Sequence, residues 1–111
     1  MMVSEEKQSD RFFLEVVLQA ADSAFLERDE VEDTLQEALG AAGLGEVTGA
    51  GAGLGVSNLD VEVTELDAGL ALVRRVLREL EVPPSTTIYL NEGDQSKGTG
   101  KVTPYRVYEP P

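Results

Sequence analysis

The clearest pattern in the chain is an alternation of apolar and mixed side chains over residues 11–19. This segment is rich in β-branched and aromatic residues, and its length suits one strand. Successive side chains of a strand point to opposite faces, so one set should face a core and the other should face away. We expect the core set to be Phe12, Leu14, Val16 and Leu18, and the opposite set to be Phe13, Glu15, Val17 and Gln19.

A helical pattern follows. Asp29 with Glu32 has the spacing of a capping box, which would begin a helix, and Gly43 would end it as a C-cap. The predicted apolar stripe consists of Val31, Leu35, Ala38, Leu39 and Ala42. Phe25 and Leu26 lie off this stripe, so we expect them in a separate turn that covers one end of the core.

Residues 46–65 predict a hairpin, in which a glycine-rich strand and a turn near residues 55–58 precede an alternating strand. In that strand the apolar and polar sets are Leu59, Val61 and Val63 against Asp60, Glu62 and Thr64.

A second helix would begin at Asp67 as its cap and stop before the Pro83 and Pro84 pair. Its stripe is Leu70, Val73, Leu77 and Leu80. Residues 86–91 form the last clear strand, with Ile88 and Leu90 facing inward.

Strand, helix, hairpin, helix and strand is the β-α-β-β-α-β order of the ferredoxin-like α+β sandwich. The expected sheet has four antiparallel strands in the order 4-1-3-2, with both helices on one face. We expect a polar tail at 1–10, the domain at 11–92, and a polar loop with a tail or edge strand at 93–111. Pro104 suits an edge strand but not a central one. Many unrelated families share this architecture, so it indicates no function.

Composition narrows the classes of function. The 111 residues fit one domain, and 21 acidic against 9 basic residues give a net charge of -12, which would repel nucleic acid and anionic membranes. The chain has no cysteine and no histidine, so disulfides, thiolate metal sites and the commonest general base are excluded. No apolar run reaches the roughly 18 residues of a membrane span. The start of the chain does not resemble a signal peptide, so we expect a cytoplasmic protein.

Three groups of residues invite a chemical interpretation. The glycines at 49, 51, 53 and 55 lack phosphate-loop spacing and a following helix, so they indicate a bulge, a bend or a close backbone approach. Four carboxylates, Asp60, Glu62, Glu65 and Asp67, lack the spacing of a calcium loop, so we expect no metal, cofactor or catalytic site.

The third group is the one basic cluster, formed by Arg74, Arg75 and Arg78. We expect these arginines to pair with neighbouring carboxylates rather than to bind an anion.

The predicted sheet face opposite the helices is the most informative feature. Phe13, Glu15 and Val17 should lie centrally, flanked by residues 60, 62 and 64 on one side and by Thr87, Tyr89 and Asn91 on the other. Exposed apolar groups with a polar rim suggest an interface. We therefore expect a non-catalytic binding module that contacts a basic protein, as inhibitors or immunity proteins do, or a second copy in a dimer. The expected contact residues are Phe13, Glu15, Val17, Asp60, Glu62 and Tyr89.

An alternative function is a regulatory domain that senses a small molecule. The ligand would lie at Gly49, Gly51 and Gly53 or at a subunit interface. A metal-assisted enzyme is a third and weaker alternative.

Overall fold

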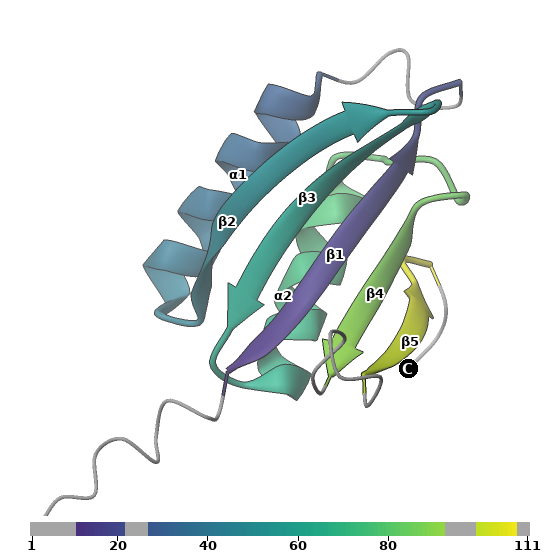
Figure 1. The fold of residues 1–111 in the computed structure, drawn as a ribbon. Helices are drawn as coiled ribbons and strands as arrows, with labels where there is room; N and C mark the ends of the chain where they lie inside the picture. The colour runs from purple at the N-terminus through teal and green to yellow at the C-terminus, as the bar shows by residue number, and fades with distance from the viewer. Residues whose placement is uncertain (1–10, 22–26, 93–99, 109–111) are drawn as a thin grey trace, which may run out of the picture.

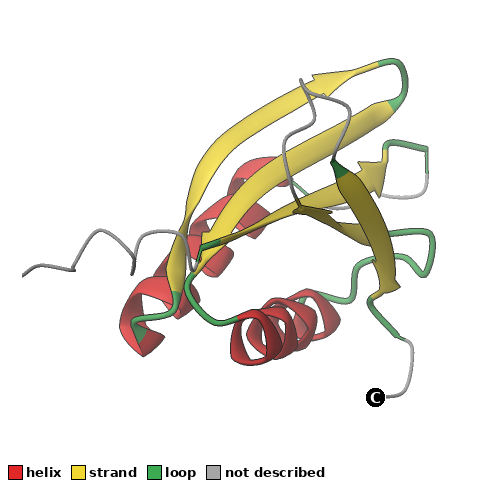
Figure 2. Ribbon diagram, turned by 60° about the horizontal axis from the view of Figure 1, so that its bottom comes forward, coloured by secondary structure: helices red, strands yellow, loops and turns green. Residues whose placement is uncertain are grey.

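One antiparallel sheet with two helices on one of its faces forms the part of the chain that the computed structural model describes, residues 11–21, 27–92 and 100–108 (Figures 1 and 2). The predicted α+β class is therefore confirmed. The elements are β1 (Phe12–Gln19), α1 (Arg28–Ala42), β2 (Gly45–Gly53), β3 (Val56–Val63), α2 (Leu66–Glu79), β4 (Thr87–Glu92) and β5 (Lys101–Arg106). Phe25 and Leu26, for which we predicted a separate turn, lie outside the described residues.

The sheet has five strands in the order β2-β3-β1-β4-β5. It differs from the expected four-stranded sheet of order 4-1-3-2 because β5 pairs with β4 and extends that side. Residues 101–106 of the C-terminal segment thus form an edge strand, and Pro104 lies at the edge, where a missing N–H costs no ladder bond.

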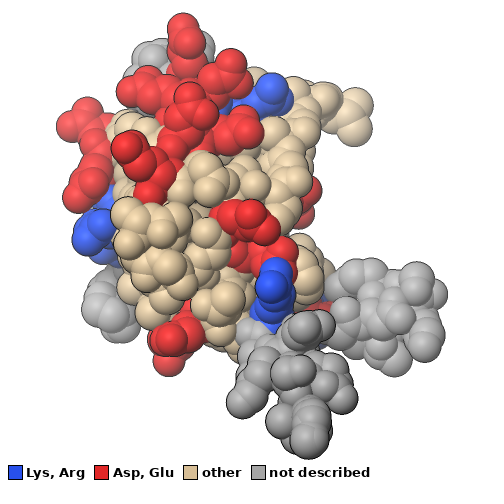
Figure 3. All heavy atoms as spheres, turned by 90° about the vertical axis from the view of Figure 1, so that its left-hand side faces the viewer, with Lys and Arg blue, Asp and Glu red and all other residues tan. Residues whose placement is uncertain are grey.

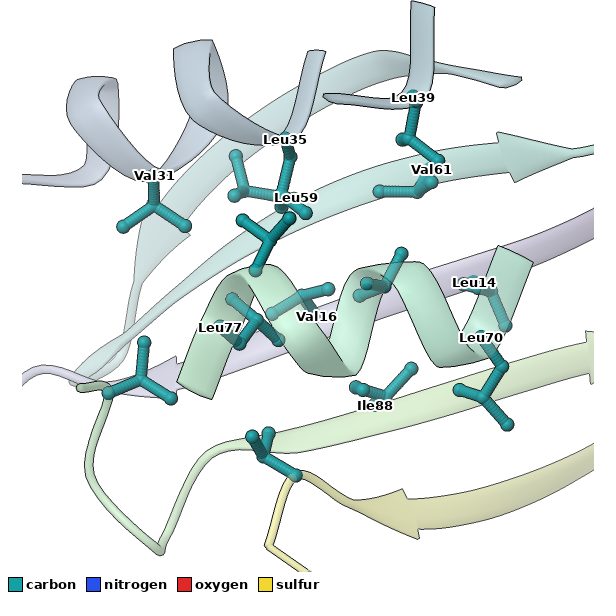
Figure 4. Packing of buried hydrophobic residues seen from close by; sticks show 14 of the residues in the cluster. Leu14, Val16, Val31, Leu35, Leu39, Leu59, Val61, Leu70, Leu77 and Ile88 are labelled. Carbon is teal, nitrogen blue, oxygen red and sulfur yellow. The ribbon is translucent and has the colours of Figure 1, made fainter. Parts of the chain in front are cut away.

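The core fills the space between the sheet and the helices (Figure 4). Leu14, Val16 and Leu18 of β1 are buried as predicted, and Phe12 packs against them from a partly buried position. The buried members of the two helical stripes are Val31, Leu35, Leu39, Leu70, Val73 and Leu77. Ala42 is exposed, so the first stripe was predicted one residue too long. The prediction also missed Val76, Val82 and Val107, which are buried as well.

Both predicted N-caps are wrong. The N-cap residues are Glu27 and Glu65, and neither makes a side-chain capping bond. Asp29 and Asp67 lie two residues after these N-caps, within the first turn, where a carboxylate still interacts favourably with the positive end of the helix dipole. The C-cap prediction is confirmed, because Gly43 adopts the left-handed conformation at φ 68°.

The hairpin turn lies earlier than predicted. Leu54 and Gly55 are its two central residues, with φ values of 54° and 83°, the signs that a tight two-residue hairpin turn requires. Ser57 and Asn58, which we placed in the turn, instead pair with Ala52 and Gly51. The pairing then shifts by one residue between residues 47 and 49. That shift is the bulge that the glycine pattern indicated.

Side chains of helix α2 form hydrogen bonds to β5 and to the turn after it. Arg74 Nε donates to the carbonyl of Arg106 at 2.9 Å, and Arg78 Nε donates to the carbonyl of Val107 at 2.7 Å. The Arg74 guanidinium also lies 5.6 Å from the centre of the Tyr105 ring. The expected carboxylate pairing holds for Arg75, which lies 3.8 Å from Glu79 one turn later. Two of the three arginines, Arg74 and Arg78, therefore attach the edge strand and its following turn to the helix layer.

Candidate association surface

The strand register brings the predicted contact residues together on the sheet face opposite the two helices, where no other helix of the described residues lies (Figures 1 and 2). We call this surface the open face. Each outward residue of β1 lies between one residue of β3 and one of β4, at a typical Cβ separation of about 4.5–5.5 Å. The three rows are Glu62–Phe13–Asn91, Asp60–Glu15–Tyr89 and Asn58–Val17–Thr87. Thr64 follows the last residue of β3, so it lies beyond these rows.

Apolar groups form one part of the open face. Phe13 is 51% exposed, whereas Val17 and Tyr89 are half-buried by their neighbours. Strand β5 adds Val102, which is 50% exposed and lies opposite Asn91, and Pro104, which lies opposite Tyr89. The prediction missed these two residues, although the alternation in KVTPYR would have placed both on this face once the segment was assigned to an edge strand.

Acidic groups form the other part of the open face. Glu62 lies opposite Glu46 in the β2–β3 pair and forms an ion pair with Arg11. The hydrogen bond from Arg11 to Glu62, together with their opposite charges, raises the pKa of Arg11. Glu15 and Asp60 are directly opposite each other in the β1–β3 pair, so both acidic residues lie in the middle of the face, and the Asp60 carboxylate leans from there toward β2. Their negative charges would attract a cationic group of a partner.

Neighbouring side chains occupy the space over two of the candidate ligand-binding glycines. A Cβ built at Gly49 would lie 3.2 Å from Asp60 Oδ2, and one built at Gly51 would lie 3.1 Å from Asn58 Oδ1. A Cβ at Gly53 would meet nothing within 4 Å. The first two glycines therefore allow side chains of β3 to lean over β2. This packing explains why glycine is present at both positions without a bound ligand.

Two cavities lie near the open face. The larger, of about 470 Å³, is lined by Pro84, Ser85, Thr87, Tyr89, Pro104 and Arg106. The smaller, of about 280 Å³, includes Arg11, Gly45 and Glu62 in its lining. Gly49, Gly51 and Gly53 line neither of these two cavities.

The four carboxylates considered for metal binding lie on different elements. Asp60 and Glu62 project from β3, whereas Glu65 precedes α2 and Asp67 lies in its first turn. Within residues 11–21, 27–92 and 100–108, no three acidic side chains are grouped as a metal ion would require.

Comparison with protein-family models, with curated proteins and with solved structures finds no match for this chain. In the described part of the chain, no helix combines the length and the apolar character needed to cross a membrane.

Proposed function

We propose that the chain is a non-catalytic binding module whose open face engages a basic protein. The observation that carries this proposal is the group of apolar side chains around the central Glu15, namely Phe13, Val17 and Tyr89. No helix of the described residues covers this group, and carboxylates border it (Figure 2). Exposed apolar groups with a polar rim are typical of association surfaces. The apolar groups would act as anchors that slow dissociation, and the acidic groups would speed the encounter with a basic surface.

Charge favours a basic protein over a second copy on the open face. Two copies that packed face to face would bring the central Glu15 and Asp60 carboxylates of each subunit near those of the other. Each copy also carries a net charge of -12, so repulsion would oppose the approach. The resemblance to inhibitor and immunity proteins is one of charge and size. Cytoplasmic localisation and the absence of catalysis are parts of the same proposal.

We further propose that β1 to β4 with both helices form a ferredoxin-like unit that β5 extends. Because unrelated families share that architecture, it adds no support to a particular partner. The small-molecule alternative has less support, because Asp60 and Asn58 occupy the space over Gly49 and Gly51.

The test compares open-face variants with a matched control. Phe13→Asp and Tyr89→Asp place a charge among the proposed anchors, whereas Leu54→Asp makes a similar change at a fully exposed residue of the hairpin turn. Leu54 has a positive φ that aspartate tolerates, so the control should fold. Proteins captured by the intact chain are identified, purified and titrated against all variants, whose folding is checked by circular dichroism.

We expect the two open-face variants to lose a basic partner that Leu54→Asp retains. If both variants bind every purified partner as tightly as the wild type does, the open face is ordinary surface and the proposal is wrong.

A further inference from the structure

The two edges of the sheet differ in how they are protected against a further strand. The β5 edge is short and carries Lys101, Pro104 and Arg106, which are groups that natural proteins use to block strand addition. The β2 edge runs for nine residues, contains no proline, and has Glu46 as its single charged residue. An edge of this kind presents unpaired main-chain groups in a row.

The hairpin geometry indicates which main-chain groups of β2 point outward. In a two-residue turn the flanking residues, here Gly53 and Val56, form the hydrogen-bonded pair. Bonded and non-bonded pairs then alternate, so the N–H and C=O groups of Ala50 and Ala52 point away from β3. Near the start of β2, the Val47 N–H donates to Gln36 Oε1 of α1 at 2.9 Å. The open part of the edge is therefore residues 48–53, and no strand of the described chain pairs with it.

Carboxylates flank this edge on both sides. Helix α1 contains five acidic residues and one basic residue. Its Gln36 reaches the edge, and one and two turns earlier the same side carries Glu32 and Asp29. On the other flank, the Asp60 carboxylate leans over Gly49. Figure 3, which looks onto this side of the molecule, shows acidic side chains gathered around an area without charge.

We infer that the β2 edge accepts an extended segment of a basic protein as a sixth strand. This inference rests on the proposed function and adds a binding mode to it. Side chains of an added strand would point alternately toward α1 and toward the open face, so lysine or arginine on either side would meet carboxylates. The alanines and glycines of residues 49–53 offer no deep side-chain pockets, so charge and main-chain bonds would select the segment.

A second copy fits the same edge less well. Antiparallel pairing of β2 with itself would bring the two α1 helices together across the symmetry axis. The acidic side of each helix would then face the acidic side of the other. The residues concerned in both copies are Asp29, Glu32 and Asp33. Charge therefore favours a basic strand over a second copy of the chain at the β2 edge.

The experiment titrates the whole chain with a capped peptide of about ten residues in which pairs of lysines alternate with pairs of valines, so that lysines lie on both faces of the added strand. Calorimetry gives the Kd, and amide chemical shifts locate the site, which we expect at residues 48–53. Ala50→Pro should weaken binding by about tenfold or more, because it removes an outward N–H and adds a ring at the edge. Ala50→Ser keeps the N–H and should bind as the wild type does. Since this N–H is not used in the β2–β3 ladder, the proline variant should fold.

Two further arms do not depend on the folding of that variant. Methylation of alternate peptide nitrogens on the side that faces β2 should abolish binding to the unaltered protein. The same peptide with glutamate in place of lysine should not bind. Asp60→Asn and Glu32→Gln should each weaken the lysine peptide about two- to fivefold at low salt, the usual worth of an exposed ion pair.

Three results would overturn the inference. One is equal binding by Ala50→Pro and the wild type, and another is equal binding of the methylated peptide. The third is a dimer of the wild type, seen in sedimentation velocity, that the Ala50→Pro substitution dissociates. That result would show that a second copy occupies the edge. Phe13→Asp should leave peptide binding at β2 unchanged, so a failure of the open face and a failure of the edge are distinguishable.

Discussion

Adjacent residues of β1 offer a direct test of the two-layer arrangement. Leu14 is 1% exposed and lies under the helices, whereas Phe13, the residue before it, is half exposed on the open face. Truncation of each to alanine removes a large apolar group from the same strand, so the comparison depends on which face is covered. Leu77→Ala is a second core truncation, from the buried side of α2.

The expected losses differ because burial differs. A fully buried leucine costs about 2–5 kcal/mol when it is cut to alanine, since the cavity relaxes only in part. Full burial of phenylalanine is worth about 1.5–3 kcal/mol, so a half-exposed ring contributes about 1 kcal/mol. Its cross-strand contacts with Glu62 and Asn91 add about 0.2–1 kcal/mol. We therefore expect Phe13→Ala to cost about 1–2 kcal/mol, less than either leucine truncation.

Urea denaturation followed by circular dichroism measures these differences. All variants should share one slope, so that the shift in midpoint reports stability alone. Equal losses at Phe13 and Leu14 would mean that both faces of the sheet are buried, and both the two-layer fold and the open face would then be refuted.

Three further outcomes are expected. Tyr108→Phe should cost about 0.5–1.5 kcal/mol in urea denaturation, because its hydroxyl donates to the Val82 carbonyl; an unchanged midpoint would contradict that bond. Gly45→Ala should destabilise by about 1–3 kcal/mol or more, since its Cβ would lie 2.0 Å from the Glu62 carbonyl oxygen, whereas Gly53→Ala, with open space around it, should lose far less. Activity screens with and without divalent metal should find no hydrolase or transferase turnover, and a turnover abolished by Glu62→Gln would reverse this.

Local sequence patterns predicted the strands and helices in which buried and exposed residues alternate with a regular period. The alternation in β1 assigned Leu14 and Phe13 to opposite faces, as observed, because one side of that strand packs entirely on the helices. The spacing in α2 likewise identified Leu70, Val73 and Leu77. The open-face positions followed from the same alternation, once β1 was placed between β3 and β4.

The features that the sequence did not predict depend on contacts between distant segments. Leu54 adopts a left-handed conformation that its side chain does not favour, because the β2–β3 register requires the turn there. Asp67 matched a cap motif, but the helix begins earlier because Leu66 packs against the core. Val107 is buried only through the position of β5 beside β4 and α2. No local pattern carries that information.

Asp60 joins the two surfaces proposed for binding. It lies opposite Glu15 in the middle of the open face, and its carboxylate also leans over Gly49 toward the free edge. A strand added at β2 would therefore place alternate side chains beside the acidic part of the open face. A basic protein that gave up one extended segment to the edge could rest its folded part on Phe13 and Tyr89. In that arrangement the edge supplies main-chain bonds and the apolar side chains of the open face supply anchors. Asp60 contributes to both surfaces, so its charge should affect binding through either one.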